Sequence, residues 1–196
     1  MMQDRQRWPK PLLQMVARSY SPREAERFAT LEFDDRGWDV FEDVCRDVLQ
    51  SCRIVSGACV IMSALLSTRL TEALDVPVPV VAGAMKVAGR YVYGGDAQVD
   101  RAAFSSSDLD WDGHCWALFG RLLVDISLGR TARAGACDPL LARTVVSAFG
   151  DKVGLIALNE GEARAADLRY LPRCVLTPAQ LGPLAAGARV KFDLSG

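Results

Sequence analysis

The chain has 196 residues, and its 23 basic and 24 acidic side chains nearly cancel at pH 7. This balance does not indicate a nucleic acid or an anionic membrane as a partner. Half of the residues are hydrophobic, which is typical of a globular protein, and the length suits one domain with a substantial core. No apolar run is long enough to cross a membrane and no signal-peptide pattern opens the chain, so we expect a cytoplasmic protein.

The sequence contains six cysteines but a single histidine, His114. The cysteines form no Cys-x-x-Cys pair, and one histidine supports no closed zinc site, so neither a metal nor another cofactor is expected. In a reducing compartment we expect free thiols, whose most frequent role is that of a small buried apolar side chain. Chemistry that needs an imidazole must use His114.

The first predicted elements are helical. Residues 1–20 suggest an irregular or weakly helical arm. Ser21, Pro22 and Glu24 form a helix start, with a capping serine and a proline at the first helical position, for a helix that ends near Leu31. After an expected turn at 34–37, a second helix carries the apolar stripe Trp38, Phe41, Val44, Cys45, Val48, Leu49 and Cys52. Cys45 and Cys52 are therefore expected in the core.

A third helix is predicted from Ala58 to Leu74, and because its first half is apolar almost all round it should lie centrally. A strand over 78–87 and a shorter one over 91–93 follow it, before a polar loop over 94–113. Two further strands, 114–119 and 122–127, are joined by a two-residue hairpin turn at Gly120 and Arg121.

Asp138 and Pro139 then cap and begin a helix that runs to about Phe149, and a strand covers 153–158. Residues 159–196 give no clear pattern. The simplest architecture is one α+β domain over 1–196, with helices first and an antiparallel sheet after them. Its core is expected in about 38–158, with an arm at 1–20 and a C-terminal extension at 159–196.

The hairpin turn sets the register of its two strands, and that register predicts a pair of functional side chains. Counting outward from the turn places Trp116 opposite Asp125 and His114 opposite Ser127. These four residues therefore share one face of the sheet, and Asp125 lies diagonally from His114, within reach of its side chain. A buried carboxylate needs a partner. Cys115 falls on the opposite face and is expected in the core.

Cys59 is the cysteine whose setting favours reactivity. It falls in the first turn of the apolar helix, after the small residues Ser56, Gly57 and Ala58. Helix N-termini favour the thiolate form of a cysteine, and their free N–H groups can serve as an oxyanion hole. Together with His114 and Asp125, Cys59 supplies a nucleophile, a base and an orienting acid.

Three motifs carry a resemblance to a known superfamily: Gly-Ala-Cys at 57–59, Gly-His-Cys-Trp-Ala at 113–117 and Leu-Leu-Val-Asp-Ile-Ser at 122–127. Over residues 50–130 the chain resembles the transglutaminase-like branch of the papain-like cysteine enzymes, and 120–129 is similar to the aspartate strand of arylamine N-acetyltransferases. The resemblance implies a nucleophile-bearing central helix packed on an antiparallel sheet, with Cys59, His114 and Asp125 as catalytic residues. The acetyltransferases' Arg-Gly-Gly run before the cysteine is missing, so coenzyme A is not expected.

Three more residues are candidates for the substrate cleft. Trp116 shares the His114 face, where it either lines the cleft or is a core aromatic. Trp111 stands in an acidic loop that either covers the site or is simply solvated. Through the resemblance, Gln50 is a candidate for the side-chain oxyanion donor that an upstream glutamine supplies in papain-like enzymes, although it falls on the polar face of its helix. The expected substrate is a peptide, a protein or a small acyl compound, and the alternative is a catalytically silent domain that binds a protein or peptide.

Overall fold

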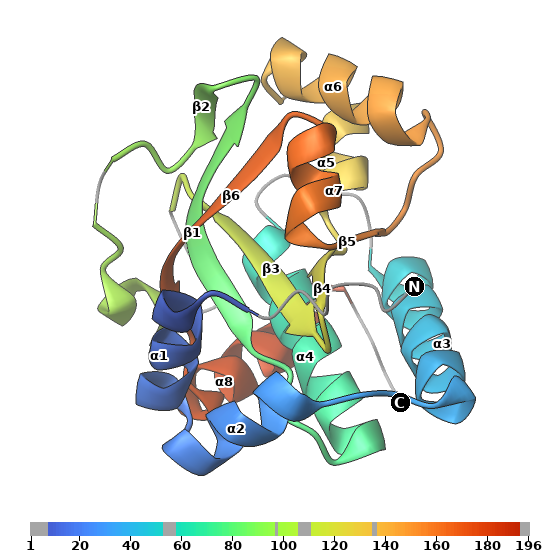
Figure 1. Ribbon diagram of the computed structural model, residues 1–196. Helices are drawn as coiled ribbons and strands as arrows, with labels where there is room; N and C mark the ends of the chain where they lie inside the picture. Colours follow the sequence, from blue (N-terminus) through green and yellow to red (C-terminus); the bar gives the residue numbers. More distant parts are fainter. Residues whose placement is uncertain (1–7, 53–57, 97, 106–110, 135–136, 193–196) are drawn as a thin grey trace, which may run out of the picture.

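The computed structural model describes residues 8–52, 58–96, 98–105, 111–134 and 137–192 (Figure 1). The helices are α1 (Lys10–Ser19), α2 (Pro22–Thr30), α3 (Asp35–Ser51), α4 (Cys59–Leu74), α5 (Leu128–Arg133), α6 (Pro139–Phe149), α7 (Glu160–Ala165) and α8 (Pro178–Lys191), with a short 3-10 helix η1 (Arg101–Ser105). The strands are β1 (Val80–Val87), β2 (Arg90–Tyr93), β3 (His114–Phe119), β4 (Leu122–Asp125), β5 (Ile156–Leu158) and β6 (Leu168–Val175). Within these ranges no helix is long and apolar enough to span a membrane.

All strand pairings in the sheet are antiparallel, as the sequence predicts. Strand β1 is central: β6 pairs along one of its edges, while β3 and then β2 pair along the other. Beyond β3 the order continues through β4 to β5. The fold is therefore a mixed α+β arrangement in which helices pack on an antiparallel sheet (Figure 1).

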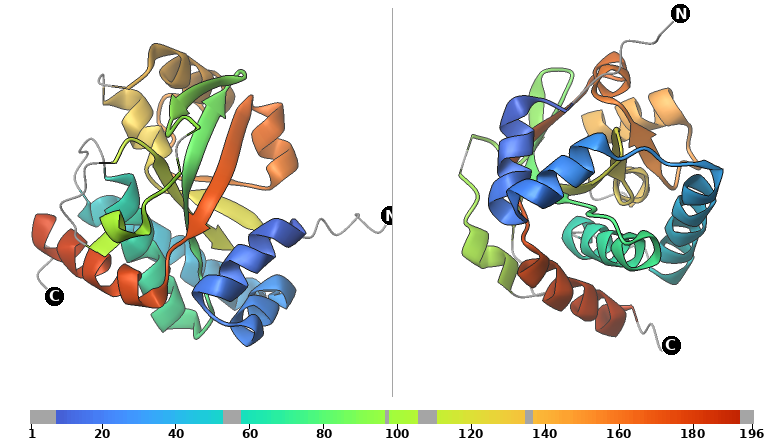
Figure 2. Two further views of the ribbon diagram at one scale, coloured as in Figure 1. Left: turned by 90° about the vertical axis from the view of Figure 1, so that its left-hand side faces the viewer. Right: turned by 60° about the horizontal axis from the view of Figure 1, so that its bottom comes forward.

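Helices cover both faces of the sheet. Helix α4 packs against β3 and is flanked by α3 and α8 (Figure 2). This central position explains why α4 is apolar nearly all round, with residues such as Leu65 and Leu66 fully buried. On the other face, Leu12 and Val16 of α1 and Phe28 of α2 pack in one hydrophobic cluster with Trp116 and other sheet residues.

The helix-start signals in the sequence are confirmed, and one local prediction is wrong. The Ser21 side chain accepts the Glu24 N–H, and the Asp138 side chain accepts the Leu140 N–H, as N-caps do. Residues 34–37 do not form a separate turn, because Asp34 caps α3 directly by accepting the Gly37 N–H. Residues 10–19, within the expected irregular or weakly helical arm, form a regular helix, because its apolar side is buried against the sheet.

The core extends beyond the expected limits of 38–158 at both ends. The C-terminal segment supplies β6 as a full-length partner of β1, and it supplies α8 as a partner of α4. Leu184 and Ala188 of α8 are buried in the hydrophobic core. The region that gave no sequence pattern is thus structurally integral, and its strand brings a residue to the candidate site.

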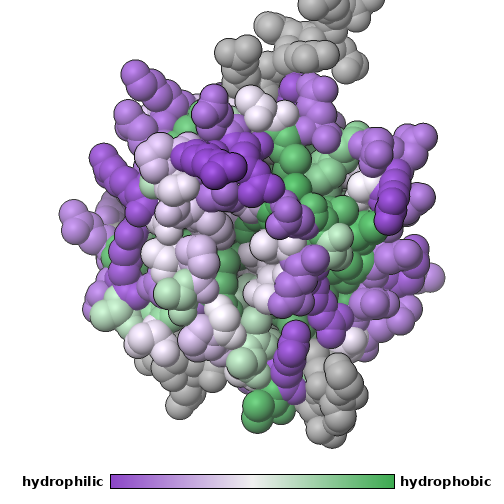
Figure 3. Space-filling view, turned by 90° about the horizontal axis from the view of Figure 1, so that it is seen from below, coloured by the Kyte–Doolittle hydropathy of each residue, from purple (hydrophilic) through white to green (hydrophobic). Residues whose placement is uncertain are grey.

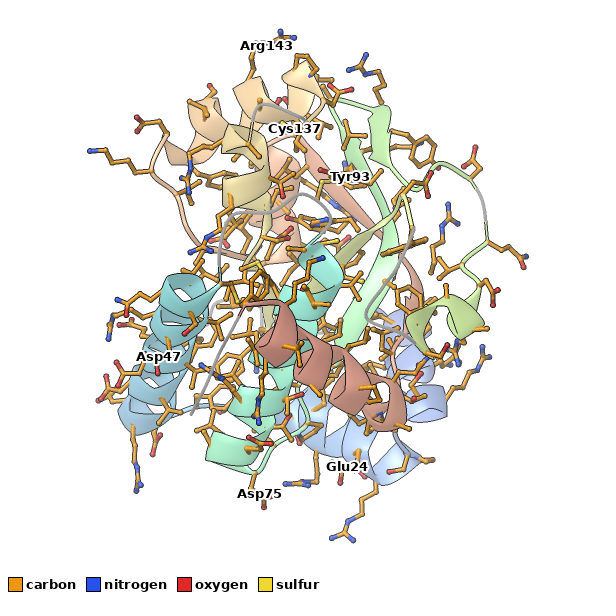
Figure 4. All side chains as sticks on the ribbon, turned by 180° about the vertical axis from the view of Figure 1, so that it is seen from behind. Glu24, Asp47, Asp75, Tyr93, Cys137 and Arg143 are labelled. Atoms are coloured by element: carbon orange, nitrogen blue, oxygen red, sulfur yellow. The ribbon has the colours of Figure 1, made fainter. Side chains whose placement is uncertain are left out.

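Figure 3 shows the molecule from below, where hydrophilic residues surround areas of hydrophobic residues. Among the described residues the exposed large hydrophobic side chains are Trp38, Val146 and Val190, which lie on three different helices. Side chains such as Asp47, on the polar side of α3, point into solvent (Figure 4).

Candidate active site

The predicted pair of His114 and Asp125 is formed. The hairpin register is the predicted one, with Ala117 opposite Val124 and Phe119 opposite Leu122. His114 begins β3 and Asp125 ends β4, and the distance from His114 Nε2 to Asp125 Oδ2 is 2.5 Å. Both side chains are buried, with exposed fractions of 2% and 0%. With the imidazole protonated, Nε2 donates to the carboxylate in a charge-assisted hydrogen bond.

Asp125 is satisfied on both carboxylate oxygens. Oδ1 accepts the N–H and hydroxyl of Ser127, at 3.1 Å each, and the N–H of Leu128 at 2.9 Å. Oδ2 accepts the hydroxyl of Tyr170 at 3.0 Å besides its bond with His114. Burial acts to raise the pKa of the Asp125 carboxyl, but the charge and hydrogen bond of His114 and the two backbone N–H groups hold that pKa below its usual value.

The neighbours of His114 raise the pKa of its imidazole. Burial acts to lower the pKa of the imidazole, but the charge of Asp125, the hydrogen bond with Asp125 and a hydrogen bond with the Cys59 side chain outweigh burial and raise it. Because Nε2 faces Asp125, Nδ1 is the ring nitrogen left for the thiol. The imidazole therefore connects the carboxylate to the cysteine.

Cys59 is the first residue of α4 and is partly exposed, as expected for a reactive thiol. Its neighbour Ala58 is the N-cap residue and makes no side-chain hydrogen bond to the first turn. The first-turn N–H groups of a helix are suited to stabilise an anion. The preceding Ser56 and Gly57 lie outside the described residues. Cys59, His114 and Asp125 thus come from α4, β3 and β4, and they meet as one group.

The other cysteines differ from Cys59. Cys45, Cys52 and Cys115 are buried, as the sequence predicts. Only Cys137 among the remaining thiols is also partly exposed, and burial raises its pKa. Cys137 lies near Tyr93 (Figure 4), and both side chains pack against the same hydrophobic cluster. This second accessible thiol is a natural internal control for the reactivity of Cys59.

Two tyrosines complete the surroundings of His114, and the sequence did not reveal either of them. The Tyr93 ring stacks on the imidazole with ring centres 5.1 Å apart. Tyr170 of β6 donates to Asp125 and packs edge-on against Trp116. The run Leu-Arg-Tyr-Leu at 168–171 was a weak strand signal, and Pro172 obscured it because proline is rare within strands.

The three cleft candidates have different outcomes. Trp111 is partly buried against the same cluster as Cys59 and meets Phe104 edge-on, so it lies on the thiol side of the site. Gly113 permits this position, because a Cβ there would stand 2.0 Å from the Trp111 ring. Trp116 is buried on the sheet face opposite Cys59, where its ring centre lies 6.3 Å from that of His114. Gln50 is exposed on α3, and no described hydrogen bond joins it to the site.

The described residues hold no cluster of ligands suited to a metal ion. No protein-family model matches the chain, and neither the curated proteins nor the solved structures show a protein similar to it. The chemistry of the site must therefore be inferred from its own geometry.

Proposed function

We propose that this protein is a cysteine-dependent acyl-transfer enzyme that acts on an amide or ester of a peptide, a protein or a small acyl compound. Cys59 is the nucleophile, His114 the general base and acid, and Asp125 the residue that orients and charges the imidazole. The observation that supports this most strongly is the fully hydrogen-bonded His114–Asp125 pair, buried beside a partly exposed thiol at a helix start.

The proposed reaction has two halves. In the first, Cys59 acts as a thiolate whose proton is already held on Nδ1 of the charged His114, and its sulfur bonds to the carbonyl carbon. First-turn N–H groups of α4 stabilise the negative charge on the carbonyl oxygen. The carbon–nitrogen or carbon–oxygen bond then breaks, the leaving group takes the proton from His114, and a thioester remains on Cys59. In the second half, water or an amine gives its proton to His114 and bonds to the thioester carbon. The carbon–sulfur bond then breaks, which releases the acyl product and restores the Cys59 thiolate beside the charged His114.

Thiol alkylation tests the proposal directly. The intact protein is treated with limiting iodoacetamide at pH 7, and labelled peptides are quantified by mass spectrometry. Cys59 should react on the order of tenfold faster than Cys137, although both thiols are partly exposed. The variants His114→Gln and Asp125→Asn should slow the labelling of Cys59 and leave that of Cys137 unchanged.

A second measurement asks whether the thiol accepts an acyl group. Incubation with a panel of p-nitrophenyl esters should give a mass increase that maps to Cys59 and is lost on treatment with hydroxylamine. Equal labelling rates of Cys59 and Cys137, with no trapped acyl group on Cys59, would refute catalysis and favour a silent binding domain of the same architecture.

A further inference from the structure

A pocket of about 250 Å³ opens on the sheet face that α1 covers. Its lining residues include Leu12 and Met15 of α1, Ala163 of α7 and the buried Trp116, as well as the charged Arg164 and Arg169. An apolar cavity of about 150 Å³ accommodates a benzene ring, so this pocket is large enough for an aromatic or a long aliphatic side chain. Helix α4 and Cys59 belong to the opposite sheet face, so the pocket is not the approach to the thiol.

The pocket adjoins an edge of the sheet. Strand β6 pairs with β1 on one side, and no described strand pairs with its other side. Residues Leu168–Pro172 of this strand line the pocket. Figure 2 shows this edge of β6 between α7 and α1. A sheet edge of this kind presents backbone N–H and C=O groups that another chain can pair with.

The register identifies which backbone groups face outward. Ala88 N–H donates to Asp167 O, and the pairing continues with Lys86 opposite Arg169 and Met85 opposite Tyr170. Bonded and non-bonded pairs alternate in antiparallel strands, so Arg169 bonds to β1 whereas Tyr170 directs its N–H and C=O away from β1. These two groups of Tyr170 therefore lie at the open edge, beside the pocket.

We propose that the edge of β6 binds an extended peptide segment that carries one large apolar side chain. The peptide backbone exchanges two hydrogen bonds with Tyr170, and the apolar side chain enters the pocket between α1 and α7. Strand addition to a sheet edge combines these two features: backbone bonds supply affinity and a pocket supplies specificity. Pro172 has no N–H, so it limits the pairing to a few residues and makes the interaction short. This binding does not depend on the catalytic role of Cys59.

Matched short peptides separate the two parts of the proposal. The probe is acetyl-Ala-Phe-Ala-amide, titrated into the intact protein by calorimetry and by amide NMR. The first control replaces phenylalanine by serine, which cannot fill the pocket. The second carries a methyl group on the phenylalanine nitrogen, which removes the backbone donor. We expect the probe to bind at one site and to shift the Tyr170 amide signal, and each control to bind at least fivefold more weakly.

Protein variants locate the site. Ala163→Leu places a larger side chain in the pocket and should weaken the probe at least fivefold. Met15→Trp fills the pocket from the other helix and serves if the first variant does not fold. Arg143→Gln changes an exposed side chain on α6 (Figure 4), outside the pocket lining, and should bind the probe unchanged.

Three results would overturn the proposal. Equal binding of the probe and its N-methyl control would show that the pocket takes an apolar group without strand addition. No binding at millimolar probe would show that the edge is closed to peptides. A dimer in sedimentation that the probe cannot dissociate would show that a second copy of this chain occupies the edge.

Discussion

His114 and Tyr170 contact the same atom, Oδ2 of Asp125, from strands that are far apart in the sequence. The imidazole approaches this oxygen at 2.5 Å and the phenol at 3.0 Å. The phenol is a neutral donor, so it stabilises the carboxylate without replacing the charge that His114 provides. Tyr170 is therefore a positioning residue for the proposed catalytic group, whereas Cys59 and His114 would touch the substrate.

The single histidine allows its titration to be followed without assignment. Its pKa is raised to about 10 by Asp125 and Cys59, against the lowering effect of burial. The His114 signals in an imidazole NMR titration should therefore stay in the charged form through pH 8. In Asp125→Asn, burial remains and the carboxylate charge is gone, so the pKa should fall below about 6.5. An ordinary titration near pH 6.5 in the natural protein would contradict the described pair.

The same shift predicts how stability depends on pH. A histidine whose pKa is raised on folding stabilises the folded state fully below its unfolded pKa of about 6.5. That contribution declines as the pH rises toward about 10. For Asp125, whose pKa is lowered, the contribution is present above about pH 4 and is lost in more acidic solution. Urea unfolding should therefore show a decline from pH 6.5 to 10 that is absent in the double variant His114→Gln, Asp125→Asn.

Removal of the Tyr170 hydroxyl should lower the stability of the folded protein. Tyr170→Phe deletes a buried hydrogen bond to a carboxylate, so the free energy of unfolding should fall by about 1–3 kcal/mol. Tyr91→Phe is the matched control, because its hydroxyl bonds Asp96 at an exposed site and should cost less than about 0.5 kcal/mol. If both variants unfold alike, the Tyr170–Asp125 bond is not formed in solution.

Gly83 packs so closely against β6 and Trp116 that there is no room for a Cβ at this position. A Cβ at this position would lie 2.2 Å from the Leu171 carbonyl oxygen and 3.0 Å from the Trp116 ring. Gly83→Ala should therefore destabilise the fold by about 2–3 kcal/mol, because β6 must move away from β1. Gly182→Ala, on an open side of α8, should instead stabilise by about 0.5–1 kcal/mol. Thermal unfolding of the two variants reports the opposite signs.

Arg130 joins α5 to the end of α3. Its guanidinium donates to the carbonyl groups of Leu49 and Cys52 at the end of α3. Arg130→Met should lower the free energy of unfolding by about 1.5–3 kcal/mol, because charged donors to partly buried acceptors are lost. Arg133→Met removes bonds to exposed carbonyls and should have a smaller effect in the same urea experiment.

The parts of the site that the sequence predicts are those that local geometry determines. A two-residue turn leaves one register for the strands beside it, so His114 and Asp125 follow from the spacing alone. The position of Cys59 at a helix start is equally local. Its hydrogen bond with His114 depends on how α4 packs on the sheet, which no spacing reveals.

The parts that the sequence does not predict depend on distant partners. Tyr170 reaches Asp125 only because β6 pairs with β1, a strand much earlier in the chain. No local sequence rule predicts that pairing. Proline is tolerated in a strand mainly at a sheet edge, so Pro172 counts against a strand prediction until the position of β6 is known. Helix α1 is hard to predict for the same reason. Its apolar side chains are buried only by packing on a sheet that distant parts of the chain form.

The late position of β6 has a consequence for synthesis on the ribosome. A nascent chain that has emerged only through β5 already contains the cysteine, the histidine and the aspartate, yet one whole edge of its central strand is bare. Such an intermediate exposes an apolar strand edge to other chains and is prone to aggregate. Chains truncated after about residue 160 should accordingly accumulate in inclusion bodies, and Asp125 would gain its Tyr170 hydrogen bond only after β6 has been synthesised.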